Sequence, residues 1–432
     1  MRPWNKVYTP FFLWLLILSS SLFSYHRDVE KILFSGTDSQ NTFFASSAIL
    51  EKALSSLKSK SFDKIELRVV QLMVQKKLPH LNFTIESVRN IYALVSYIQE
   101  NKKDLFSGVN SLYFYSSREI PLDLQIYDDG TAYIHFGGND PKKAKGGYKH
   151  FSRSINLKDK KLYANLVLDA SNPKNLQKLA HELDVMRHMK LSSSALTFEH
   201  FSLFQGALGK KKATIQTKLF SSDLKGMFEN KLSLKSKLLL MLKSAKSLKR
   251  LHTKGYVHRD IKARNFFVEE KNNGKYGVII ADYGFAEAYK IFSQRNSLMG
   301  TKGYIDPYLC KLRVQKPDHL IRFHHKKSSD IFSLGMMFYD FLMDQIEAKE
   351  KNYQINLHAM RKWEGPLPYE AYVSLIEKEL DKIEDTSSDV KGKIPSFLKK
   401  TIFKMISPSQ KDRPSLRRVI SDLKKALKKI KN

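Results

Sequence analysis

The stretch that decides the fold of this chain is His258-Arg259-Asp260-Ile261-Lys262-Ala263-Arg264-Asn265, which is followed by Ala281-Asp282-Tyr283-Gly284. Transfer of a phosphoryl group needs cations on the phosphates, oxygen ligands that hold those cations, and a carboxylate that orients the attacking hydroxyl. Asp260 is the candidate for orienting the hydroxyl, and Lys262 supplies a positive charge for the phosphate. The candidate metal ligands are Asn265 and Asp282.

Both motifs stand in a regular structural context. Before the first, apolar residues recur at helical spacing after Ser233, a good helix-capping residue. Before the second, the apolar residues 276–281 predict a strand. This order resembles the protein-kinase superfamily, whose catalytic loop reads H-R-D-x-x-x-x-N and whose metal motif reads D-F-G. The resemblance implies an α+β, bilobal fold with a small β-rich N-lobe and a large helical C-lobe, and ATP and Mg²⁺ as cofactors.

Further motifs extend the resemblance towards the C-terminus. Residues 300–307 resemble the end of an activation segment, and Asp330 resembles the aspartate that braces the catalytic-loop backbone in the family. Arg413 resembles a late C-lobe arginine that normally pairs with a glutamate of the activation segment. The uncharged Tyr308 stands at that glutamate position, so the nearby Asp306 is the candidate replacement.

The N-lobe departs from the family pattern. Gly146 and Gly147 fit the glycine loop over the phosphates imperfectly, and Leu166 stands where the family has its third-strand lysine. Glu182, on a helical pattern, matches the glutamate that normally pairs with that lysine. Two interpretations compete. Either the domain is a pseudokinase, or Lys149 supplies the charge from the neighbouring strand, in a position that resembles the with-no-lysine kinases.

The hinge between the expected lobes is predicted less directly. Residues 213–220 resemble the strand that enters the hinge of a kinase. On that alignment, backbone groups near Thr217 and Leu219 are expected to contact the adenine of the nucleotide.

The N-terminus carries a separate signal. Arg2 and Lys6 precede an apolar run over residues 11–23. A basic segment followed by about a dozen apolar residues is typical of a secretory signal and is short for a membrane-spanning helix. A cleaved signal, an uncleaved anchor and a buried helix are the alternatives. Export would place a kinase where ATP is scarce, so we expect delivery into another ATP-containing compartment.

These signals divide the chain into three parts. Residues 1–24 are the signal peptide or membrane anchor, and residues 25–120 are a helical N-terminal extension, with helical spacing near residues 49–57 and 84–98. The extension is expected to pack on the kinase lobe or to serve as a targeting module. The kinase-like domain covers residues 121–432, with an N-lobe of about 121–220 and a C-lobe of about 221–432. A hairpin around Asp128-Asp129-Gly130 is expected to begin its sheet.

Composition limits the partners. The chain has 432 residues and a net charge of +31, which favours anionic partners in general. The lysines are scattered, so solvated surfaces explain most of this charge; an acidic partner or an anionic membrane is a second explanation, and nucleic acid is not expected. One cysteine, Cys310, excludes an intramolecular disulfide, and no Cys or His set has the spacing of zinc ligands.

The expected reaction is ATP-dependent phosphorylation of protein serine or threonine. Lys262, two residues after Asp260, has the spacing of serine/threonine kinases. A pseudokinase scaffold and a small-molecule kinase are the alternatives. We also expect Ser293, Ser297 and Thr301 to be sites whose phosphorylation would pair them with Arg259.

Overall fold

The chain folds into two compact units. The structure, a computed structural model, describes residues 49–55, 61–106, 110–137, 144–145, 149–189, 196–205, 211–228, 232–271, 275–288, 300–301, 303–309, 326–343 and 394–430. The first unit comprises Met1–Asp184 and Phe198–Leu219, and the second comprises Val185–Thr197 and Phe220–Asn432. The final division between them falls just after Leu219, in the segment that the sequence identifies as the hinge.

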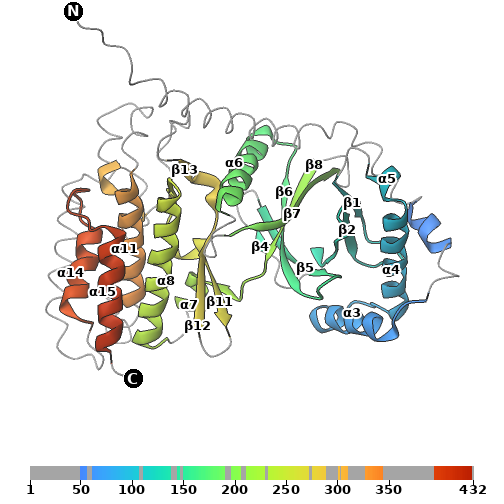
Figure 1. Cartoon of the computed structure of the whole chain (residues 1–432), viewed down its shortest axis with the longest axis horizontal. Helices are drawn as coiled ribbons and strands as arrows, with labels where there is room; N and C mark the ends of the chain where they lie inside the picture. Colours follow the sequence, from blue (N-terminus) through green and yellow to red (C-terminus); the bar gives the residue numbers. More distant parts are fainter. Residues whose placement is uncertain are drawn as a thin grey trace, which may run out of the picture. The chain divides into compact units, whose positions relative to one another are not determined.

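The first unit is built on an antiparallel sheet with the strand order β1-β2-β3-β5-β6-β8-β7, in which β4 also pairs with β5 (Figure 1). Its strands are β1 (Ser111–Phe114), β2 (Asp123–Tyr127), β3 (Ala132–His135), β4 (Ala144–Lys145), β5 (Lys149–Asn156), β6 (Leu162–Asp169), β7 (Phe198–Gln205) and β8 (Lys211–Lys218). The predicted hairpin is confirmed as β2 and β3, and Gly130 takes the left-handed backbone of its turn, with φ of 86°. The sheet begins earlier than expected, because β1 pairs with β2.

Helices cover one face of this sheet. Residues 49–55 are helical, followed by α3 (Lys64–Lys77), α4 (Ile85–Glu100) and α5 (Lys102–Leu105), and α6 (Pro173–Met189) starts in the first unit and ends in the second. Thr84 caps α4 by accepting a hydrogen bond from the Ser87 amide. The helix α3 was not predicted.

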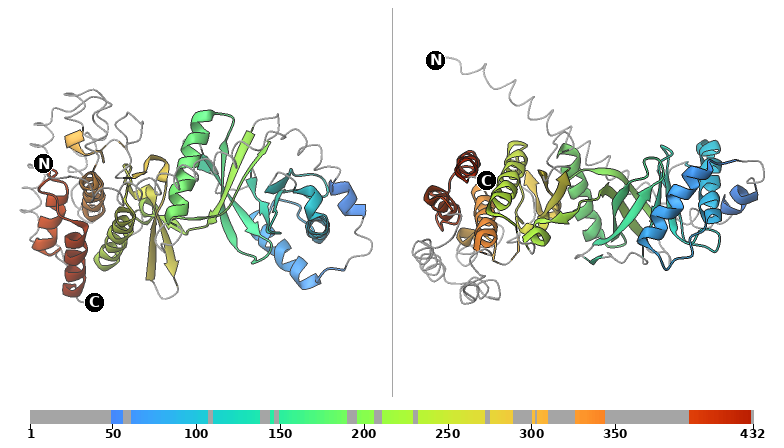
Figure 2. Two further views of the ribbon diagram at one scale, coloured as in Figure 1. Left: turned by 45° about the horizontal axis from the view of Figure 1, so that its top comes forward. Right: turned by 90° about the horizontal axis from the view of Figure 1, so that it is seen from below.

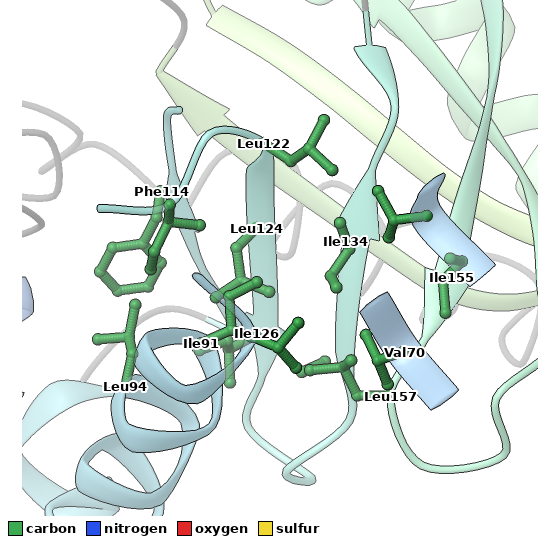
Figure 3. Close-up of a cluster of buried hydrophobic side chains, with 14 of the residues drawn as sticks. Val70, Ile91, Leu94, Phe114, Leu122, Leu124, Ile126, Ile134, Ile155 and Leu157 are labelled. Carbon is green, nitrogen blue, oxygen red and sulfur yellow. The ribbon is translucent and has the colours of Figure 1, made fainter. Parts of the chain in front are cut away.

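The core of the first unit runs across the expected boundary near residue 120. Val70 of α3 and Ile91 and Leu94 of α4 lie in one buried cluster with Leu124 of β2 and Ile134 of β3 (Figure 3). The described part of the extension therefore packs on the sheet, which is the first of the two expectations for it. The boundary itself stays a prediction.

The opposite face of the sheet carries buried polar and aromatic side chains. Side chains alternate along a strand, so Gln125 and Tyr127 point away from the helices that Leu124 and Ile126 contact. The fully buried Gln125 amide lies between Ser111 of β1, Ser202 of β7 and His135 of β3. The ring of Tyr113 in β1 stacks on Phe204 of β7 with centroids 4.2 Å apart. The sheet is therefore curled, and its two edge strands approach each other around a hydrogen-bonded interior.

The second unit is mainly helical in its described residues. Its helices are α7 (Leu224–Phe228), α8 (Leu234–Thr253), α11 (Lys327–Met343), α14 (Ser396–Met405) and α15 (Leu416–Lys429), with short 3-10 helices at Ala263–Asn265 and Tyr283–Phe285. Its strands are β9 (Ser222–Asp223), β10 (Tyr256–Val257), β11 (Phe266–Lys271), β12 (Lys275–Ile280) and β13 (Glu287–Ala288). The sheet orders are β12-β11-β9 and β10-β13.

The helices α8, α11, α14 and α15 lie side by side (Figures 1 and 2). Gly335 of α11 lets α14 approach closely, since a Cβ atom there would lie 2.7 Å from Cβ of Met405. The structure confirms Ser233 as the cap of α8, where its hydroxyl accepts a hydrogen bond from the Ser236 amide at 3.2 Å. A β-sheet lobe and a helical lobe confirm the expected α+β, bilobal class.

The N-terminal signal is not part of the described structure. Residues 1–24, with the apolar run over residues 11–23, lie outside it. Among the helices of the described residues, none has the length and hydropathy needed to span a bilayer.

Candidate functional site

The catalytic loop is held in place by a buried carboxylate from α11. Asp330 accepts hydrogen bonds from two consecutive backbone amides, at 2.7 Å from His258 and at 2.9 Å from Arg259. His252, near the end of α8, donates to the same carboxylate at 2.8 Å. Burial alone would raise the pKa of Asp330, but the hydrogen bond and charge of His252 and the nearby His258 lower the pKa to about 2. The carboxylate is therefore ionised and braces the loop, as the resemblance implies.

Asp260 lies at the centre of a hydrogen-bonded cluster. Lys262 donates to its carboxylate at 2.7 Å, and the Thr301 hydroxyl donates to it at 2.6 Å. Lys262 also donates to the Thr301 oxygen at 2.9 Å. Burial opposes ionisation of Asp260, yet the hydrogen bonds from Lys262 and Thr301 leave its pKa below the ordinary value. The side chain is thus an ionised carboxylate, suited to accept a hydrogen bond from a hydroxyl.

The two expected metal ligands belong to segments that are tied together. The Asn265 side chain donates to the backbone carbonyl of Asp260 at 2.8 Å and to its carboxylate at 3.2 Å. The amide of Ala281, next to Asp282, donates to the Asn265 carbonyl at 2.9 Å, and the His258 ring is bonded to the Ala281 carbonyl at 2.9 Å. These bonds fix the catalytic loop and the metal motif to each other.

Asp282 has an uncommon backbone conformation for a residue other than glycine. Its φ is 61° and its ψ is 69°, in the left-handed region. Such conformations persist where the surroundings enforce them, and they are frequent at functional sites. An amide oxygen and a carboxylate fit Mg²⁺, which binds to one or two protein oxygen ligands and takes the remainder from phosphates and water. In the described residues, no group of three or more His, Cys, Asp or Glu is arranged to hold a metal.

The expected replacement of the activation-segment glutamate is confirmed. Arg413 donates from two nitrogens to the two carboxylate oxygens of Asp306, at 2.7 and 2.6 Å, and both side chains are fully buried. Ser329 and Gln410 donate to the same carboxylate at 2.8 and 2.7 Å. The pair is therefore fully hydrogen-bonded, as a buried ion pair must be to persist.

Lys149, in the first unit, pairs with Glu182. The Lys149 ammonium contacts the Glu182 carboxylate, which is 1% exposed, whereas the lysine side chain is 15% exposed. Leu166 lies on β6, where Phe151 of β5 is its cross-strand partner. Lys149 is two residues before Phe151 on the same strand, so Lys149 and Leu166 project from the same face of the sheet. The ammonium group of Lys149 thus meets the glutamate from the side on which the third-strand lysine of the family would lie.

The remaining nucleotide-binding candidates stay predictions. Thr217 is buried at the end of β8, and Leu219 follows this strand half-buried. The strand begins and ends two residues before the expected 213–220. Gly146 and Gly147 lie outside the described residues.

The Thr301 hydroxyl makes contacts other than with Arg259, and its phosphorylation stays a prediction. Arg259 pairs with Glu287, and the Thr301 hydroxyl contacts Asp260 and Lys262 instead. Ser293 and Ser297 lie outside the described residues. The direct contact of Thr301 with the catalytic loop is therefore a feature that sequence reasoning missed. The signal was its place in Gly300-Thr301, at the end of the activation segment.

A β-rich lobe, a helical lobe and a loop that holds an ionised aspartate beside a lysine and an asparagine define a protein-kinase-like molecule. Comparison with known families agrees. Residues 144–423 match the model of the protein kinase domain, and the chain belongs to this family. The family generally uses ATP and Mg²⁺. The strands β1, β2 and β3 and the helices before them precede the matched region.

Similar proteins include serine/threonine kinases. Serine/threonine-protein kinase WNG1 of Toxoplasma gondii is 36% identical over 85 residues, which are 20% of this chain and 11% of that protein. Calcium-dependent protein kinase 5 of Plasmodium berghei is 25% identical over 242 residues, 55% of this chain and 40% of that protein. LRR receptor-like serine/threonine-protein kinase IOS1 of Arabidopsis thaliana is 26% identical over 235 residues, 51% of this chain and 23% of that protein. The chain spans less than half the length of these relatives.

Proposed function

We propose that this protein transfers the γ-phosphoryl group of ATP to serine or threonine hydroxyls of protein substrates. The observation that carries the proposal is the cluster in which Lys262 and Thr301 both bond the ionised Asp260. The carboxylate accepts a hydrogen bond from the attacking hydroxyl and takes its proton as the new phosphate ester forms. Lys262 places positive charge beside the transferred phosphate.

The metal ligands of this mechanism are Asn265 and Asp282. When bound there, Mg²⁺ supplies positive charge against the phosphates of the nucleotide. The hydrogen bond between Ala281 and Asn265 keeps these two ligands in register. The carboxamide of Asn265 also holds the backbone of Asp260, so one residue would hold the metal and position the base.

Lys149 is the proposed phosphate cation of the N-lobe, and Glu182 orients its ammonium group. A lysine presents charge at one point on a flexible stem, so its position along the backbone can change while the charge stays in place. An unpaired Glu182 carboxylate, buried as it is, would be costly. Gly146 and Gly147 cover the phosphates and backbone groups near Thr217 and Leu219 contact adenine in the same proposal.

A pseudokinase scaffold is the alternative that Leu166 favours, since this position lacks the lysine of the family. An assay with γ-labelled ATP and a general acceptor protein, with Lys149→Ala and Asp260→Ala as controls, separates the readings. We expect label transfer in the native protein and its loss in both variants. Nucleotide binding without transfer, or no nucleotide binding, would favour the scaffold. Transfer to sugars or amino alcohols in place of protein would identify a small-molecule kinase.

The proposal also covers location and partners. The N-terminal apolar run over residues 11–23 exports the protein or anchors it in a membrane, and catalysis takes place in a compartment that holds ATP. The net charge of +31 favours acidic partners or an anionic membrane. Cell fractionation of a C-terminally tagged chain, with and without residues 1–24, tests the location. An equal distribution of the two forms among the cell fractions would contradict the proposed location.

A further inference from the structure

The helix α3 is apolar on two opposite sides. Leu67, Val70 and Val74 face the core of the first unit, where they are buried. On the other side, Ile65 is 75%, Val69 is 40% and Leu72 is 48% exposed. These three positions follow the i, i+4, i+7 spacing of a single stripe along a helix. Among the described residues, the only other exposed large apolar side chain is Ile85, at the start of α4.

The exposed stripe is accompanied by positive charge. Lys64 and Arg68 lie along one side of it and Lys76 continues it by one turn, and all three are exposed. Glu66, the only acidic residue of α3, is directed elsewhere, because it pairs with Lys160 and accepts a hydrogen bond from Tyr92 at 2.8 Å. In Figure 2, right, α3 lies in front of the strands of its unit, with no described helix or strand of that unit over it. We call Lys64, Ile65, Arg68, Val69, Leu72 and Lys76 the α3 stripe.

We propose that the α3 stripe docks on the surface of an anionic lipid bilayer. Large apolar side chains flanked by cations are the arrangement that inserts at the boundary between headgroups and acyl chains. Each lysine or arginine near an anionic membrane adds about 1 kcal/mol of attraction. Three apolar side chains form a narrow strip, too small to serve as the core of a stable protein interface, which buries about 1,200 Å² or more in total.

The rest of the chain agrees with this occupant. A single weak membrane signal gives only marginal binding, and stable attachment takes two. The apolar run at residues 11–23, where it is retained as an anchor, is an independent signal that precedes α3 in the chain. The α3 stripe would thus add a second contact to the same membrane and hold the first unit against it.

The test uses the full chain with Cys310→Ser as background, so that a single introduced cysteine carries an environment-sensitive fluorophore. Val69→Cys reports on the stripe, and Lys103→Cys, exposed on α5, is the matched control. Phosphatidylcholine vesicles are used with and without phosphatidylserine, and some carry a spin label near the headgroups. With phosphatidylserine, we expect the fluorescence at position 69 to increase and to be quenched by the spin label. Added salt should weaken both responses, and position 103 should show neither.

Substitutions in the α3 stripe distinguish its membrane contact from binding through the N-terminal apolar run. Ile65→Gln with Leu72→Gln should reduce the quenching at position 69 about tenfold even when the chain still sediments with vesicles. Ile85→Gln, also exposed and apolar, should leave it unchanged. The charge is tested by replacing the three cations of the stripe, Lys64, Arg68 and Lys76, with glutamine, which should lower binding. The matched control removes the same charge elsewhere, at Lys52, Lys102 and Lys103, and should leave binding unchanged.

Four results would overturn the proposal. One is the absence of any change at position 69 on vesicles that bind the chain. Another is an equal response at positions 69 and 103, or with and without phosphatidylserine. The last is a response at position 69 to an acidic amphipathic peptide but not to vesicles, which would identify a protein partner instead.

Discussion

The catalytic loop of the second unit and the proposed phosphate lysine of the first unit follow the kinase pattern to different degrees. Asp260, Asn265 and Asp282 stand at the positions that the family motifs assign, whereas Leu166 on β6 holds the family's lysine position and the ammonium that pairs with Glu182 comes from Lys149 on β5. The activation-segment brace also moved, from the position of Tyr308 to Asp306.

The difference follows from what each group must contact. Asn265 bonds the backbone of Asp260, and Asp330 bonds two consecutive amides of the same loop. Short side chains that bond a particular backbone cannot work from another position. Lys149 and Arg413 carry their charge at the end of a long stem, and they need only reach one partner. Residues of the first kind are therefore fixed in sequence, while pairs of the second kind can be relocated.

The largest effect is expected at the fixed carboxylate. Asp260→Asn should lower phosphoryl transfer on the order of 10³-fold, because an amide cannot accept the proton of the attacking hydroxyl. Thr301→Asp would place a carboxylate near the same point, because the Thr301 hydroxyl lies 2.6 Å from the Asp260 carboxylate. We expect that adding this substitution does not restore activity. Initial rates of label transfer for Asp260→Asn with and without Thr301→Asp are the measurement. Recovery to a tenth of the native rate would show that this carboxylate is also movable.

The second largest effect is expected on the stability of the fold, at the relocated activation-segment brace. Arg413→Met leaves the buried carboxylate of Asp306 without its cation, which costs roughly 3–4 kcal/mol of unfolding free energy. Adding Asp306→Asn should return part of this loss, because the unpaired charge is removed. Hydrogen exchange of α11 and α15 in increasing urea measures the stability of the single and the double variant. A double variant no more stable than Arg413→Met would mean that the unpaired charge is not the cause.

The comparison is sharpest at the relocated lysine. Lys149→Met should lower transfer about 10²-fold, close to 3 kcal/mol of transition-state stabilisation. Leu166 projects from the same face of the sheet, so adding Leu166→Lys should restore much of the rate. Val167→Lys, which projects from the opposite face, is the matched control and should restore nothing. Equal rescue by the two lysines would show that their position on the sheet is irrelevant.

Sequence reasoning was strongest where a motif sits between regular elements. The capped helix before the catalytic loop and the strand before Asp282 were both predicted, because Ser233 and the apolar residues 276–281 are local signals. The pairing of Arg413 with Asp306 was anticipated because the resemblance implies a carboxylate partner for Arg413 and Tyr308, at the expected position, carries none.

What the sequence left open depends on contacts between distant residues. The helix α3 has apolar residues on two opposite sides, so it lacks the one-sided periodicity that predicts an amphipathic helix. The strand β1 is only Ser111–Phe114, and it is defined by its pairing with β2. The Thr301 contact joins residues far apart in the chain, so the activation-segment motif indicates where Thr301 belongs but not its hydrogen bond to Asp260.

The smallest expected effect concerns pH and the fixed brace at Asp330. Its pKa is about 2 in the folded protein, lowered from 3.8, so its ionised form stabilises the fold above the higher value. That stabilisation is lost as the pH falls from about 4 towards 2 and amounts to about 2 kcal/mol. Asp330→Asn does not titrate, so the stability difference between it and the native protein should shrink over this range. Urea unfolding at descending pH measures the difference, with Asp412→Asn, an exposed carboxylate of the same unit, as control. If the stability difference stays constant down to pH about 2, the catalytic loop does not depend on the charge of Asp330. The distinction between fixed and movable groups would then rest on shape alone.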